Sequence, residues 1–174
     1  WLVESRKRLA AAGVSMSINP WVTQGMRDAG LDNRPVHPDF EWMTDISGVQ
    51  AKAIACPLSP AWRRWLTDAY LLYASTGPRV LWVEDDIRVH GHRPVMWACF
   101  CDRHLRAFSQ RMGRTFTRQE LADELLRPGT PSPVRGAWLD FEGEVIEQIL
   151  RELAQAIHGR HPEVQVGIMV SAVW

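Results

Sequence analysis

Apolar residues recur along the chain at the three-to-four spacing of helices, and short apolar runs lie between most of these stretches. The helical spacing predicts helices over residues 2–12, 60–76, 105–112, 118–126 and 146–157. The short apolar runs predict strands over residues 14–18, 50–56, 80–83 and 164–170. Strands that alternate with helices through short connections are typical of α/β folds with parallel sheets.

Two features of this alternation indicate the kind of α/β fold. Long segments follow strand ends at residues 22–48 and 87–94, which both doubly wound sheets and barrels allow. No Gly-rich phosphate-binding loop follows any predicted strand, which argues against a nucleotide-binding sheet. We therefore predict an α/β fold that is part of a (β/α)8 TIM barrel, about strands two to five, with parallel strands and covering helices.

The two ends of the chain indicate that this barrel is incomplete. The sequence starts at Trp1 without an initiator Met, and no helix follows the last predicted strand to cover it. We therefore expect residues 1–174 to form a single partial TIM-barrel domain, a fragment of a longer chain.

Composition narrows the class of partner. The 20 basic and 20 acidic residues balance, so we expect neither a nucleic acid nor a membrane surface as partner. No apolar run is long enough to span a bilayer. Three cysteines are an odd number and a poor disulfide framework, which favours reduced thiols or metal ligation. A cytoplasmic location is the expectation that fits these features.

Three carboxylates, Glu84, Asp85 and Asp86, directly follow the predicted strand at 80–83. Hydrolysis of a glycosidic bond needs one carboxylic acid to protonate the leaving oxygen and a second carboxylate as nucleophile or base. The alternative is a surface acidic turn neutralised by Arg88, but the buried strand before the acids favours a catalytic role. Neighbouring strand residues face opposite sides, so Glu84 and Asp86 share one face and Asp85 takes the other.

The cysteines form a second candidate site. Cys99, Cys101 and His104 supply three potential metal ligands within six positions, and Cys56 follows an earlier predicted strand. Zinc takes four such ligands in structural sites, so the pattern predicts a Cys3His zinc site. The alternative is a set of small buried thiols beside an unrelated histidine.

A third pattern, His90-x-His92, lies shortly after the acids. With Asp85 and Asp86 these histidines could hold a catalytic metal ion, but a solvated loop is the interpretation that we favour. Polar and aromatic side chains near strand ends are candidates for sugar binding or for tuning the acid, namely Asn19, Trp21, Arg88 and His90.

With these residues in place, the order of motifs resembles the β-galactosidase-like glycoside hydrolases of family 42, or relatives of them. The resemblance is carried, over about residues 56–125, by Cys56-Pro57-x-Ser59-Pro60, Trp82-x-x-Asp85-Asp86 and Cys99-x-Cys101-x-x-His104-x-x-x-Phe108. In that family an early Cys and a C-x-C-x-x-C cluster hold a structural zinc. The resemblance implies that Cys56, Cys99 and Cys101 are zinc ligands, with His104 in place of the last Cys.

The same resemblance assigns the acids. The family's fourth barrel strand ends in an Asn-Glu pair whose Glu is the general acid/base, and Asp85 and Asp86 stand at those positions. Asp86 is therefore the expected acid/base, although Asp is one methylene shorter than Glu, and Glu84 is a longer acid out of register. The family's nucleophile lies on the seventh strand, outside this chain, so we expect the isolated fragment to be inactive.

The sequence therefore predicts a fragment of a carbohydrate-active glycoside hydrolase with a structural zinc, from a parent protein that could assemble as a homo-oligomer. Two alternatives stay open. One is a metal-dependent barrel hydrolase that uses Asp85, Asp86, His90 and His92. The other is a non-catalytic sugar-binding barrel in which the acids only form salt bridges.

Overall fold

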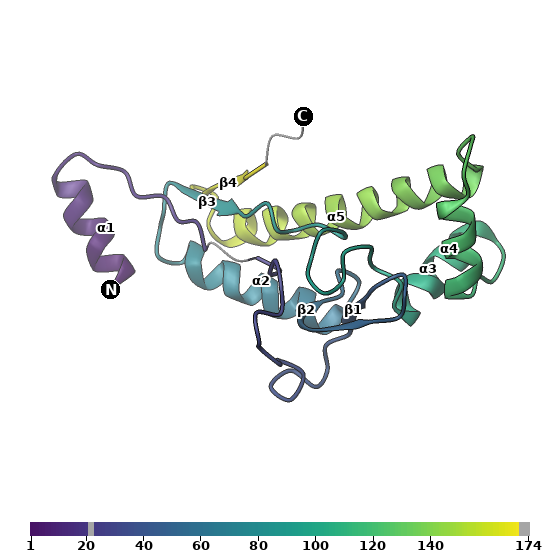
Figure 1. Ribbon diagram of the computed structural model, residues 1–174. Coiled ribbons are helices and arrows are strands. Elements are labelled where there is room, and N and C mark those ends of the chain that lie inside the picture. The colour runs from purple at the N-terminus through teal and green to yellow at the C-terminus, as the bar shows by residue number, and fades with distance from the viewer. Residues whose placement is uncertain (21–22, 171–174) are drawn as a thin grey trace.

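The computed structural model describes residues 1–20 and 23–170, which form five helices and four strands (Figure 1). The helices are α1 (Leu2–Ala11), α2 (Pro60–Ala74), α3 (Asp102–Met112), α4 (Arg118–Leu126) and α5 (Pro133–Arg160). The strands are β1 (Trp42–Thr44), β2 (Gln50–Ala55), β3 (Val80–Val83) and β4 (Gln165–Ile168). Among these helices, none combines the length and the apolar character that crossing a membrane requires.

Three of the helices begin where the sequence supplies a cap. The Ser59 side chain accepts a backbone N–H at the start of α2, and Thr117 and Glu120 form a capping box at the start of α4. Ser132 caps α5, with Pro133 as the first helical residue. This cap explains why α5 starts well before residue 146, where the apolar spacing first indicates it.

The strands of the described residues form two separate two-stranded sheets and no barrel, so the predicted partial (β/α)8 barrel is wrong. β3 and β4 pair in parallel, but β1 and β2 pair antiparallel. The turn between β1 and β2 is built locally, because the Asp45 carboxylate accepts the Ser47 N–H and Gly48 adopts a φ of +92°. A local hairpin therefore takes the residues predicted as a barrel strand at 50–56.

The parallel sheet is extended by one further contact. Ile18, at the end of the predicted strand 14–18, forms a parallel bridge with Leu81. The Ile18 N–H donates to the Val80 carbonyl, and the Trp82 N–H donates to the Ile18 carbonyl, each at 2.9 Å. The backbone groups on the opposite side of β3 form hydrogen bonds with β4. Three parallel segments thus end at the same edge.

The main hydrophobic core lies between this parallel edge and the helices α2 and α5, which pack against each other. Its most buried members include Leu66 and Tyr70 of α2, Ile149 and Leu153 of α5, and Leu81 of β3. A second, smaller core joins the β1–β2 hairpin to the loop before α3 and contains the three cysteines. Figure 1 shows α5 running from the β3–β4 pair to α3 and α4 at the other end of the molecule.

Candidate metal centre and strand-end site

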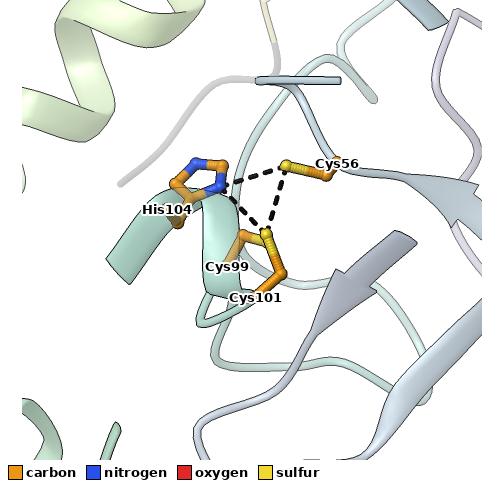
Figure 2. A group of neighbouring side chains, drawn as sticks. All are labelled: Cys56, Cys99, Cys101 and His104. Atoms are coloured by element: carbon orange, nitrogen blue, oxygen red, sulfur yellow. Dashed lines mark hydrogen bonds between the residues drawn. The ribbon is translucent and has the colours of Figure 1, made fainter. Parts of the chain in front are cut away.

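The four predicted metal ligands meet in this second core (Figure 2). Cys56 directly follows β2, Cys99 and Cys101 lie in the loop before α3, and His104 lies in the first turn of that helix. The exposed fractions of these side chains are between 0 and 7%. Their ligand atoms all lie within 4.8 Å of one another, close enough to bind one metal ion.

The distances within this cluster fit a tetrahedral ion. The Cys56 Sγ lies 3.1 Å from Nδ1 of His104 and 3.5 Å from the Cys101 Sγ, and the Cys101 Sγ lies 3.6 Å from the same nitrogen. Zinc bonds of about 2.3 Å to sulfur and 2.0–2.1 Å to nitrogen place tetrahedral ligand atoms about 3.5–3.8 Å apart. The three distances among Cys56, Cys101 and His104 therefore lie within about 0.5 Å of the tetrahedral values.

The electrostatics of the cluster favour a cation. Burial raises the pKa of the Cys56 thiol well above its usual range, with the neighbouring sulfurs acting in the same direction. Side-chain hydrogen bonds with Cys56 and Cys99 lower the pKa of Cys101, and His104 adds to this effect. Burial alone would lower the pKa of His104, but its electrostatic interaction with Cys99 and its hydrogen bond with Cys101 outweigh burial and raise that pKa. Negative charge is therefore favoured on the Cys101 sulfur, where a metal ion would neutralise it.

A fifth residue completes this centre, and the sequence analysis missed it. The carboxylate of Glu142, on α5, lies 3.6 Å from Nε2 of His104, and the Glu142 side chain is almost fully buried. Burial raises the pKa of Glu142, and the contact with His104 opposes that rise. The available signal was an acid within the buried helical stripe of Trp138, Val145 and Ile149.

The edge of the parallel sheet forms a separate polar site. Asn19 follows Ile18, Glu84 follows β3, and Met169 follows β4. The Asn19 side-chain amide donates to Oε2 of Glu84 at 2.6 Å and contacts the Met169 sulfur at 3.0 Å. Two of the predicted site residues, Asn19 and Glu84, are thus brought together at strand ends.

Asp86 makes different contacts. Its carboxylate is 1% exposed and accepts the backbone N–H groups of Thr23, Gln24 and Gly25, the last at 2.7 Å. These bonds anchor the segment of residues 23–25 to the end of β3. The predicted catalytic role of Asp86 stays a prediction, and its hydrogen bonds favour an anchoring role.

Of the other predicted binding residues, Arg88 and His90 lie away from the contacts of the strand-end site. Trp21 lies outside the described residues. Arg88 donates to the backbone carbonyls of Asp85 and His90. Arg88 and His90 both line a largely apolar cavity of about 640 Å³ beside Trp97 and α5.

The alternative catalytic metal site does not assemble in the described part of the chain. In that part of the chain, the Cys3His cluster is the group of potential metal ligands that converges on one point. This cluster includes none of Asp85, Asp86, His90 and His92. His92 is buried, with Nε2 3.0 Å from the Arg88 carbonyl oxygen, and burial lowers its pKa.

No protein-family model matches the chain, and no curated protein matches it either. Among solved structures, its fold is similar to the crystal structure of the β-galactosidase from Bacillus circulans sp. alkalophilus, with a TM-score of 0.59. The match covers 97% of this chain at 15% sequence identity, and the chain spans 29% of the length of that enzyme. At this identity the likeness shows a shared fold.

Proposed function

We propose that this chain is part of a carbohydrate-active glycoside hydrolase of the β-galactosidase-like kind that family 42 represents. The observation that carries the proposal is the structural likeness to a β-galactosidase over nearly the whole chain. The strand-end position of Glu84 supports it, because α/β folds place catalytic groups at the carboxyl ends of parallel strands.

Within this proposal Glu84, rather than Asp86, is the acid/base. Glu84 is partly exposed, and Asn19 fixes one of its oxygens by a 2.6 Å hydrogen bond. It would protonate the leaving glycosidic oxygen and then deprotonate the attacking water. Asp86 is occupied by three backbone N–H groups and would act only by positioning the segment opposite Glu84. The second carboxylate that the reaction needs would come from outside these residues.

The Cys3His cluster is proposed to hold a structural zinc. The four side chains would fill all four tetrahedral positions of the ion, which would leave no coordination position for a water or substrate. The ion would join the end of β2, the loop before α3 and α3 itself, three segments otherwise linked by the small second core. Its contribution would be to folding rather than to chemistry.

The test of the proposed function is hydrolysis of aryl β-galactosides and other aryl glycosides by the full natural protein that contains this chain. We expect turnover by the wild type and a loss of about 10²–10⁴-fold in Glu84→Gln. A leaving group too acidic to need protonation, such as dinitrophenol, should restore most of the lost bond cleavage. Asp85→Asn is the matched control, because it removes the charge of the neighbouring acid and leaves the backbone beside Glu84 unchanged.

The outcomes separate the possibilities. Absence of turnover on every glycoside in the wild type would contradict the proposed activity. Turnover that survives Glu84→Gln but is lost in a correctly folded Asp86→Asn protein would return the acid/base role to Asp86.

A further inference from the structure

We propose that Glu142 is a positioning residue of the metal centre, which accepts the Nε2–H of His104 and thereby holds the imidazole in the orientation that its metal bond requires. This inference rests on the proposed Cys3His metal centre and is independent of the glycosidase activity. It makes α5 part of a site whose ligands all lie on other elements.

The first step of the argument is the direction of the His104 ring. Its Nδ1 faces the sulfurs, 3.1 Å from the Cys56 Sγ, and Nε2 is therefore the nitrogen on the outer edge of the ring. A neutral imidazole that binds a metal through Nδ1 must carry its proton on Nε2. That N–H is fully buried, so it needs an acceptor inside the protein.

The second step is that Glu142 is the acceptor that the fold supplies. Its Oε2 lies 3.6 Å from Nε2 of His104. Among the described residues, neither carboxylate oxygen of Glu142 has a hydrogen-bond partner within the usual limit, and the same holds for Nε2 of His104. A shift of about 0.5 Å would close this 3.6 Å contact to an ordinary hydrogen-bond length.

The third step is that α5 encloses the ring as well as bonding to it. The His104 ring meets Phe141 edge-on, with centroids 5.9 Å apart, and lies tilted against Trp138 at 6.5 Å. Both aromatic residues flank Glu142 on the buried face of α5. The ring plane is thus held by packing, and the carboxylate fixes which nitrogen carries the proton.

A double-mutant cycle in the full chain tests the proposal. Zinc affinity is measured by competition with a chromogenic chelator for the wild type, Glu142→Gln and Glu142→Ala, each with His104 and with His104→Cys. The thiolate that His104→Cys introduces has no second N–H to offer. We therefore expect Glu142→Ala to weaken zinc binding about 10–100-fold with His104 and not at all in the His104→Cys background.

Two further measurements separate positioning from a general loss of structure. Glu142→Gln keeps an acceptor oxygen and the side-chain volume, so it should lose less affinity than Glu142→Ala. Glu144→Gln, on the exposed face of the same helix, is the matched control and should bind zinc as the wild type does. The absorption bands of bound Co²⁺ should shift in Glu142→Ala only when His104 is present.

Each outcome bears on a different claim. Equal losses with His104 and in the His104→Cys background, or no loss with His104, would overturn the positioning role while leaving the metal centre intact. Absence of zinc binding by the folded wild type would overturn the metal centre itself and this inference with it. Neither result depends on whether glycosides are hydrolysed.

Discussion

Replacing Asp86 with alanine removes the acceptor for three backbone N–H groups at residues 23–25. A buried donor left without a partner costs about 1–3 kcal/mol, so three of them give an upper range of about 3–9 kcal/mol. Water that enters the vacated space can accept some of these N–H groups, and we therefore expect a destabilisation of about 3–5 kcal/mol. A loss of this size is a large part of the stability of a domain of this length.

The assay is urea unfolding of the isolated chain, with Asp85→Ala as the neighbouring control. Asp85 accepts a hydrogen bond from the Arg88 side chain through its backbone carbonyl, and that carbonyl survives the substitution. The control should therefore stay within about 1 kcal/mol of the wild type, with an unchanged denaturant slope in both variants. An Asp86→Ala protein as stable as this control would refute the anchoring role.

Two further predictions concern the packing around β3. Gly167→Ala should destabilise the chain by about 1–3 kcal/mol, because the new Cβ would lie 2.5 Å from the Trp82 ring. Gly143→Ala, in open space on α5, should instead stabilise the chain by about 0.5–1 kcal/mol. Thermal unfolding of both variants measures the contrast. Burial raises the pKa of Tyr70 to about 12, so the folded chain keeps a phenol proton that the unfolded chain loses above about pH 10. Stability should therefore fall by up to about 2–3 kcal/mol as the pH rises from 10 through 12, and unfolding titrations should show that this part of the fall is absent from Tyr70→Phe.

The metal ligands were predictable because three of them lie close together in sequence. The Cys99-x-Cys101-x-x-His104 spacing places its donors at a loop-to-helix junction, where they converge without any long-range assumption. Cys56 was added as the fourth ligand that zinc requires, on its position after a predicted strand and on the family resemblance, and the structure confirms that it lies with the others. Glu142 escaped notice because a single acid in a helix carries no spacing that links it to a distant histidine.

The fold was less predictable than the site. The segments 50–56 and 80–83 were both predicted as parallel strands, yet the first pairs antiparallel within a hairpin and the second pairs in parallel with β4. Pairing partners depend on long-range packing that a local pattern does not contain. The helices, whose signals are local caps and spacing, were placed correctly, apart from the starts of α3 and α5.

The positions of the acidic side chains could not be predicted from the sequence either. Strand alternation groups Glu84 with Asp86, but β3 ends at Val83, so the alternation no longer applies beyond it. Glu84 bonds to Asn19 and Asp86 to the segment of residues 23–25. The chain beyond a strand end is directed by its hydrogen bonds, which the sequence does not display.

The metal content of the purified chain, measured beside a Cys99→Ser variant, tests the central claim most directly. The account predicts one tightly held zinc ion per wild-type chain, bound by the Cys3His cluster, and its loss or marked weakening in Cys99→Ser. A folded wild-type chain that holds no metal, or a metal content that Cys99→Ser leaves unchanged, would contradict it.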